Sequence, residues 1–143
     1  MTHEAAGRIA AHYERHARAW DADRNRQAGD WNDKPWHERF VAALPACGRA
    51  TVLDLGCGSG FPVAGFLARR GCRVTGVDTS PTLISLCRER LPGHQWLVGD
   101  MRGLKLPGRF DGILAWDSFF HLAPDDQRGM FGVFARHAVP GRC

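Results

Sequence analysis

The chain has 143 residues, of which 44% are hydrophobic and 24% charged, so it is long enough for one buried core and too short for two. No apolar run approaches the roughly 18 residues of a membrane helix, and the amino terminus lacks a signal-peptide pattern, which predicts a cytoplasmic protein that is not attached to a membrane. The five cysteines have neither paired nor metal-ligand spacing and are expected to be reduced thiols without a metal. The net charge of +4 comes from scattered arginines, which argues against a nucleic-acid partner.

Residues 1–46 show no strand pattern and are expected to form a helical segment. Apolar residues recur every three or four positions over Ala6–Trp20, which predicts an amphipathic helix. The polar stretch Asp21–Asp33 is expected to loop out. A second helix is expected to begin near residue 32 or 33, with Pro35 in its first turn. Its inward-facing residues are predicted to be Trp36, Phe40 and Leu44.

The segment Val52–Pro62 carries the most informative motif, because an apolar, β-branched strand pattern runs directly into Gly56, Gly58 and Gly60. At a turn from strand to helix, glycine lets the backbone adopt positive φ and approach a ligand closely. The helix that follows offers free N–H groups to that ligand. The dinucleotide-binding fingerprint G-x-G-x-x-G needs its third glycine at position 61, where this chain has Phe61.

An acidic residue, Asp54, precedes the first of these glycines by two positions. The resulting pattern, acid-x-Gly-x-Gly-x-Gly, resembles the first motif of the class I S-adenosylmethionine-dependent methyltransferases. The resemblance implies S-adenosyl-L-methionine as cofactor, in contact with a turn that contains Gly56, Cys57, Gly58 and Gly60. For Asp54 two interpretations stay open, direct contact with the cofactor or a structural role in which the carboxylate holds neighbouring backbone N–H groups.

A second buried strand is predicted over Arg73–Val77 and ends at Asp78, about 20 residues past the glycine turn. A carboxylate there can accept hydrogen bonds from two ribose hydroxyls, so Asp78 and the adjacent Thr79 are candidate cofactor residues. Ser80 suits a helix N-cap and Pro81 the first helical position. The helix that they start is expected to carry an apolar face made of Leu83, Ile84, Cys87 and Leu91.

Two further strands are predicted, at Gln95–Val98 and within Phe110–Trp116. The resemblance implies that Asp100, at the end of the third strand, hydrogen-bonds the adenine amino group while Met101 packs on the ring. At the end of the fourth strand, Trp116 is a candidate wall for the methionine end of the cofactor. Its backbone carbonyl is a candidate acceptor for the cofactor's ammonium group.

The repeated strand and helix units predict an α/β fold with a Rossmann-like, doubly wound parallel sheet, in which ligands bind at the carboxyl ends of the strands. The family's strand order is 3-2-1-4-5-7-6, and about four of its usual seven strands are expected here. By the same resemblance, residues 1–46 form a helical lid and residues 47–143 form the S-adenosylmethionine-binding core. Tyr13 in the lid is a candidate cofactor contact, since its hydroxyl can reach a carboxylate, and a packing role is the alternative.

Methyl transfer from a sulfonium is an in-line displacement with a neutral leaving group, so the protein mainly aligns the reactants and excludes water. One general base helps if the acceptor carries a proton, and the loop after the fourth strand offers Asp117 and His121. We favour His121 because histidine titrates near working pH, although it can also serve only as a packing residue. The loop lacks the proline motifs of enzymes that methylate nucleic-acid bases, which favours a small-molecule acceptor.

After one more helix over Pro124–Ala138, the chain ends at Cys143, where the family's fifth strand is expected to begin. The chain therefore looks truncated, and residues 113–116 of the fourth strand would form an apolar sheet edge that favours a homodimer or aggregation. The first functional hypothesis is a small-molecule methyltransferase. The alternatives are a catalytically silent, cofactor-binding or self-associating fragment, and a nicotinamide-binding domain, against which Phe61 and Asp100 argue.

Overall fold

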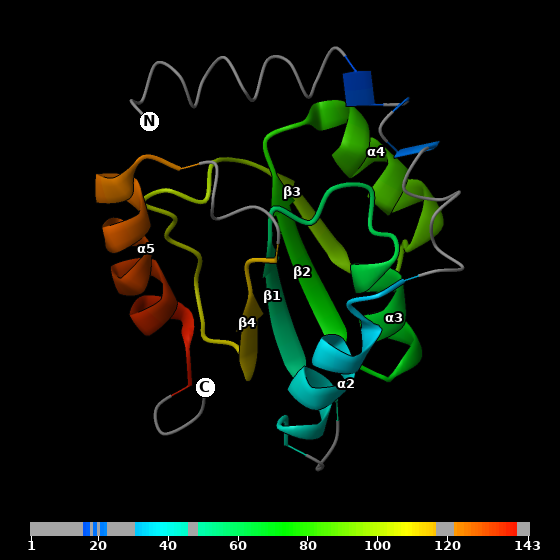
Figure 1. Ribbon diagram of the computed structural model, residues 1–143, viewed down its shortest axis with the longest axis horizontal. Coiled ribbons are helices and arrows are strands. Elements are labelled where there is room, and N and C mark those ends of the chain that lie inside the picture. Colours follow the sequence, from blue (N-terminus) through cyan, green and yellow to red (C-terminus); the bar gives the residue numbers. More distant parts are fainter. Residues whose placement is uncertain are drawn as a thin grey trace.

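A computed structural model describes residues 16–17, 19, 21–22, 31–45, 49–116 and 122–139. Its centre is a parallel sheet of four strands in the order β3-β2-β1-β4 (Figure 1). The predicted α/β Rossmann-like sheet is confirmed, including the relative order of its first four strands. The bounds of the strands are β1 Thr51–Leu55, β2 Arg73–Asp78, β3 Gln95–Val98 and β4 Gly112–Leu114.

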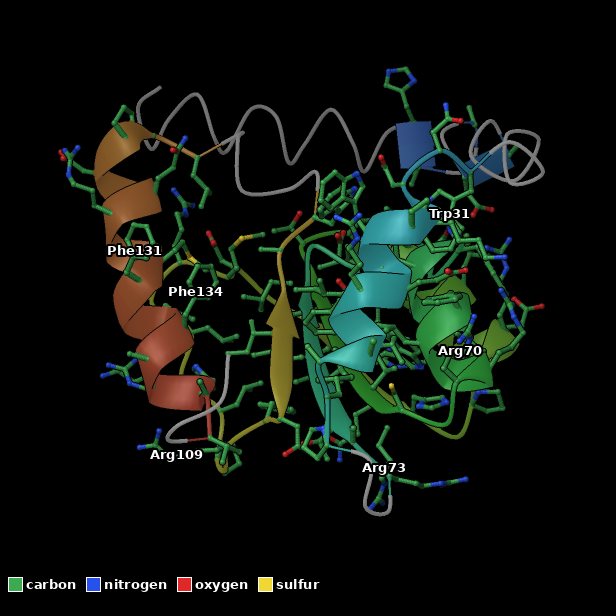
Figure 2. All side chains as sticks on the ribbon, turned by 60° about the horizontal axis from the view of Figure 1, so that its bottom comes forward. Trp31, Arg70, Arg73, Arg109, Phe131 and Phe134 are labelled. Atoms are coloured by element: carbon green, nitrogen blue, oxygen red, sulfur yellow. The ribbon has the colours of Figure 1, made fainter. Side chains whose placement is uncertain are left out.

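Helices cover both faces of the sheet (Figure 1). The helices α2 (Lys34–Ala42), α3 (Val63–Arg69) and α4 (Pro81–Arg90) pack on one face, and α5 (Pro124–His137) packs on the other. Alternate residues of β1 point to the two faces, so Val52 joins the core under α2, α3 and α4. Leu53 and Leu55 join the core under α5, where Phe134 packs, whereas Phe131 stays 65% exposed (Figure 2).

The start of α4 confirms the predicted cap. The Ser80 hydroxyl accepts a hydrogen bond of 3.1 Å from the backbone N–H of Leu83, and Pro81 opens the helix. Leu91, expected on the apolar face of the helix, is the residue that immediately follows α4. This leaves its carbonyl to accept a 2.8 Å hydrogen bond from the indole Nε1 of Trp96.

The fourth strand is shorter than the predicted run, and the backbone around its start explains the difference. Phe110 forms a parallel bridge with Ala138, the residue after α5, while the N–H of Asp111 donates to Thr51 of β1 at 2.9 Å. Because neighbouring residues of a strand direct their N–H groups to opposite sides, Ala138 lies on the side of this chain segment away from β1. The chain after α5 therefore lies beside the segment that leads into β4, on the side away from β1.

The inward face of α2 differs from the prediction by one residue. Trp36 is 56% exposed and its ring lies under the guanidinium of Arg39, 4.9 Å from the ring centroid, so the prediction that Trp36 faces the core was wrong. The buried residue is His37, which is 1% exposed. Residues 37, 40, 41 and 44 have the i, i+3, i+4, i+7 spacing of one helix face, whereas position 36 is rotated away from it.

The predicted loop from Asp21 to Asp33 was wrong at its first residues. Asp21 is helical and only 6% exposed, and both of its carboxylate oxygens accept hydrogen bonds of 2.7 Å from Arg90 of α4. Nearby, Ala17 packs against Leu83 and Leu86 of the same helix. A buried carboxylate needs such a charged partner, which the polar sequence pattern alone did not reveal.

We expect the stability of the fold to fall below neutral pH through His94, whose Nδ1 accepts a 3.0 Å hydrogen bond from the N–H of Val74. Burial lowers the pKa of His94, and Arg49 and Arg73 lower it further. At pH values below the ordinary pKa of about 6.5, His94 binds a proton in the unfolded chain but stays neutral in the folded chain. The free energy of unfolding therefore decreases as the pH is lowered, until the pH lies below the pKa of His94 in the folded chain.

His94→Asn keeps an acceptor oxygen near the Nδ1 position and does not titrate in this range. Chemical unfolding at a series of pH values should therefore give a flatter profile for His94→Asn than for the wild-type chain between neutral pH and mildly acidic pH. Parallel profiles for the two chains would show that His94 does not contribute to the pH dependence.

Candidate functional site

The glycine turn between β1 and α3 has the backbone that its sequence predicts. Gly56, Gly58 and Gly60 have φ values of 73°, 58° and 93°, a region that favours glycine. The N–H groups of Gly56 and Cys57 donate to the carbonyl of Val77 at 2.7 and 3.1 Å. The turn is thereby held against the carboxyl end of β2.

Asp78 joins the ends of β1 and β2. Its Oδ1 accepts a hydrogen bond from the N–H of Gly58, and its Oδ2 accepts one from the N–H of Ser80, both at 3.1 Å. Since a carboxylate has about four acceptor positions, these two bonds are compatible with further donors such as ribose hydroxyls. Thr79, the other candidate on this turn, is exposed beside it.

Asp54 lies within β1 and is 3% exposed, with Gly76 and Leu114 as its partners in the neighbouring strands. Its negative charge acts on the glycine turn, because it contributes to a raised pKa of the Cys57 thiol. Both interpretations of Asp54, cofactor contact and backbone support, stay predictions. The acidic position of the motif nevertheless lies within the buried part of the sheet.

Two thiols pack beneath the turn. Cys87 of α4 donates from its Sγ to the carbonyl of Gly58 at 3.1 Å. A hydrogen bond with Cys87 is the largest cause of the raised pKa of Cys57, followed by burial. Both side chains are at most 8% exposed, and Cys72 is also a free, buried thiol. Cys57 and Cys87 therefore support the turn by packing and hydrogen bonding.

At the end of β3, Asp100 is held by Arg102. The carboxylate accepts hydrogen bonds of 2.9 and 3.0 Å from the guanidinium Nε, and Arg102 also pairs with Asp126 of α5 at 3.2 Å. The hydrogen bonds that Arg102 donates to Asp100 are the largest cause of its raised pKa, and they outweigh burial, which lowers that pKa. Met101 is half-buried against the core under α5. The predicted adenine residues thus lie on a turn that Arg102 ties to α5.

Trp116 follows β4 and contacts α2. Its indole Nε1 donates to the Asp33 carboxylate at 3.0 Å, and its ring lies 4.9 Å from that of His37. The ring of Trp31, which precedes α2 and is labelled in Figure 2, also lies 4.9 Å from the ring of His37, and it lies 5.4 Å from that of Phe66. His37 was not a predicted site residue, although its place on the i, i+3, i+7 face was the available signal.

The structure brings together ten of the candidate residues at the carboxyl ends of the four strands, as parallel connections require. The remaining three, Tyr13, Asp117 and His121, lie outside the described residues and stay predictions. Within the part of the chain that the structure describes, no helix has the length and apolarity needed to cross a bilayer. The ten gathered residues are Asp54, Gly56, Cys57, Gly58, Gly60, Asp78, Thr79, Asp100, Met101 and Trp116.

This arrangement is that of a Rossmann-like α/β protein with its ligand site at the carboxyl ends of the strands. The chain belongs to the methyltransferase domain family, whose sequence profile matches residues 52–141. The resemblance to class I S-adenosylmethionine-dependent methyltransferases is thereby confirmed. A solved structure of a TehB-like SAM-dependent methyltransferase from Corynebacterium glutamicum is similar with a TM-score of 0.68 at 30% identity, covering 90% of this chain and 67% of that one.

Two curated relatives cover smaller parts of the chain. Magnesium-protoporphyrin O-methyltransferase of Rhodobacter capsulatus is 44% identical over 80 residues, which are 52% of this chain and 35% of that protein. Trans-aconitate 2-methyltransferase of Rhodopseudomonas palustris (strain BisB18) is 33% identical over 113 residues, which are 78% of this chain and 43% of that protein. The matched regions therefore span less than half the length of either relative.

Proposed function

We propose that this chain is the cofactor-binding part of an S-adenosylmethionine-dependent methyltransferase that acts on a small-molecule acceptor. The observation that carries the proposal is the Asp78 carboxylate, which accepts the N–H of Gly58 and so unites the glycine turn with the end of β2. Family membership supports the reaction class. The names of the two curated relatives, which refer to magnesium-protoporphyrin and trans-aconitate, support a small acceptor.

The chemistry of the residues present fits this cofactor. A turn with three positive φ values leaves room for close approach of a ligand to the backbone, and Asp78 supplies acceptors for ribose hydroxyls. Asp100 is 42% exposed at its side chain and can accept the adenine amino group while Arg102 holds it. When bound, the cofactor supplies an electrophilic methyl group on a sulfonium.

The chain's own residues would bind, orient and shield the reactants. We assign Thr79 and Met101 to the cofactor pocket, Trp116 to its methionine end and Tyr13 to a lid formed by residues 1–46 over a core of residues 47–143. Asp117 and His121 remain candidate bases in the loop after β4. A cytoplasmic location and an acceptor other than nucleic acid belong to the same proposal.

A calorimetric titration of the chain with S-adenosylhomocysteine tests the proposed function. Saturable binding is expected, and NAD should not compete for the site. Binding by NAD in preference to S-adenosylhomocysteine would favour a nicotinamide-binding domain instead. If a chain with a cooperative unfolding transition binds neither compound, the proposed cofactor site is wrong.

We further propose that β4 forms the interface of a homodimer. Among the described residues, β4 pairs with β1 on one side, and beyond it only the Phe110–Ala138 bridge lies at the start of the strand. An incompletely paired apolar edge favours strand addition by a second copy. Sedimentation at tens of micromolar should show a dimer, and Ile113→Lys should shift it to monomer. A wild-type chain that sediments as a monomer would exclude this interface.

A further inference from the structure

The imidazole of His37 is buried, and its two ring nitrogens differ in their surroundings. His37 is 1% exposed, and its Nδ1 lies 2.9 Å from the carbonyl oxygen of Asp33, one helical turn earlier. A carbonyl can only accept, so Nδ1 carries the proton and donates it. In the neutral ring Nε2 then bears a lone pair, and this atom has no hydrogen-bond partner among the described residues. Leaving such an acceptor buried and unused is costly to the fold.

His137 of α5 provides an internal comparison. It is equally buried, and its Nδ1 lies 2.7 Å from the carbonyl of Val133, again one turn earlier. Its Nε2, however, accepts a 2.9 Å hydrogen bond from the N–H of Leu106. The ring of His137 is thus paired at both nitrogens, whereas the ring of His37 is paired at Nδ1 alone among the described residues.

The position of His37 relates it to the ligand side of the sheet. Phe40 and Leu44 pack directly over Gly112 at the start of β4, where a Cβ atom would lie 2.6 and 2.7 Å from them. His37 lies about one turn before Phe40 on the same helix face, and its ring contacts Trp116, two residues beyond the end of β4. The helix therefore runs antiparallel to β4, and its N-terminal end, with His37, lies at the carboxyl end of that strand.

We propose that Nε2 of His37 receives the hydrogen of the methyl acceptor, and that the acceptor's nucleophile is therefore a hydroxyl or an amine rather than a carboxylate. This inference rests on the proposed methyltransferase function. A hydroxyl or amine offers the N–H or O–H that Nε2 lacks. A carboxylate offers no hydrogen to the lone pair of the neutral ring.

The step balances without another reactant. The acceptor's oxygen or nitrogen donates an electron pair to the methyl carbon, while the carbon–sulfur bond breaks and its pair remains on sulfur as the neutral thioether S-adenosylhomocysteine. The O–H or N–H bond breaks and its proton passes to Nε2, which makes the ring an imidazolium. When the acceptor is an amine, the proton that passes to Nε2 is the one that the ammonium form must lose before its nitrogen has an electron pair to donate. Release of this proton to water after product leaves restores the neutral ring.

Three variants separate the functions of the ring. His37→Phe keeps an aromatic ring and removes both nitrogens, and the carbonyl of Asp33 still accepts the N–H groups of Trp36 and His37. His37→Asn keeps a donor near the Nδ1 position only, whereas His37→Gln places an amide oxygen near the Nε2 position. His137→Phe is the matched control for stability, since it removes an Nε2 that is paired.

The transfer test uses isotopically labelled S-adenosylmethionine as the methyl donor. Each small carboxylic acid is compared as an acceptor with the amine and the alcohol that have the same carbon skeleton. Label is expected on amines or alcohols, with rates about 100-fold lower in His37→Phe and His37→Asn. His37→Gln should retain the KM for the acceptor and lose kcat. Faster transfer to the acid than to its matched amine and alcohol would overturn the inference, and so would a His37→Phe rate within about twofold of wild type.

Thermal unfolding gives a second readout that does not depend on the acceptor. His37→Phe should unfold at an equal or higher temperature than the wild-type chain, because it removes an unpaired buried acceptor, while His137→Phe should unfold at a lower one. A lowered midpoint for His37→Phe would overturn the inference whatever the transfer results. Binding of S-adenosylhomocysteine separates the two proposals. If the chain does not bind this compound, the proposed cofactor site is rejected. If the chain binds it but transfers methyl groups preferentially to carboxylates, only the proposed role of His37 is rejected.

Discussion

Replacement of Asp78 by alanine is expected to weaken the binding of S-adenosylhomocysteine by at least about 100-fold, because hydrogen bonds to a charged group contribute about 1.5–3 kcal/mol each and two ribose hydroxyls would lose them. The change also removes the acceptors of the N–H groups of Gly58 and Ser80, so the glycine turn loses its tie to β2. Calorimetric titration of the wild-type and Asp78→Ala chains measures this loss directly.

Asp111→Ala is a matched control at the opposite end of the sheet. The Oδ2 of Asp111 accepts the backbone N–H of Thr51 at 2.9 Å, so this carboxylate also joins two strands, at the start of β1 and β4. We expect Asp111→Ala to lower stability and to change the dissociation constant by no more than about twofold, since Asp111 lies at the opposite end of the sheet from the proposed cofactor site. Equal binding by Asp78→Ala and wild type would mean that Asp78 is only a structural link.

Local sequence signals were sufficient for much of the fold and for the strand ends of the site. Ser80 and Pro81 fix the start of α4 because a cap and a preset φ act within one turn of helix. The glycine turn was equally predictable, since positive φ at Gly58 depends on that residue's own lack of a side chain. Asp78 could be located by its distance from this turn along a strand and helix unit.

Features that depend on contacts between distant segments were not predictable in the same way. The pairing of Asp21 with Arg90 joins residues 69 positions apart, and nothing near Asp21 in the sequence indicates its partner. Trp36 appeared to be a core residue by its hydrophobicity, but the rotation of α2 against β4 is set by Gly112, which accommodates Phe40 and Leu44. That rotation buries His37 instead, so the polar neighbour, and not the tryptophan, lies on the inward face of the helix.

Replacement of Gly76 by alanine is expected to be the most destabilising single change in the sheet. A Cβ at Gly76 would lie 2.5 Å from the ring of Trp96 and 2.8 Å from the Sγ of Cys57. The ring cannot easily withdraw, because it is 4% exposed and its Nε1 is bonded to the carbonyl of Leu91 at 2.8 Å. Overpacking of this kind costs about 3 kcal/mol, and urea unfolding should measure that loss.

The same substitution should also weaken cofactor binding, since pressure on Cys57 acts directly on the glycine turn. Gly93→Ala is the matched control, because nothing lies within 4 Å of a Cβ at that position, and it should change stability by less than about 0.5 kcal/mol. If Gly76→Ala were as stable as Gly93→Ala but bound S-adenosylhomocysteine poorly, the result would mean that Cys57 and the glycine turn, rather than Trp96, had moved to make room for the new Cβ. If both stability and binding were retained, the close packing of β2, Trp96 and Cys57 would not be what holds the turn in position.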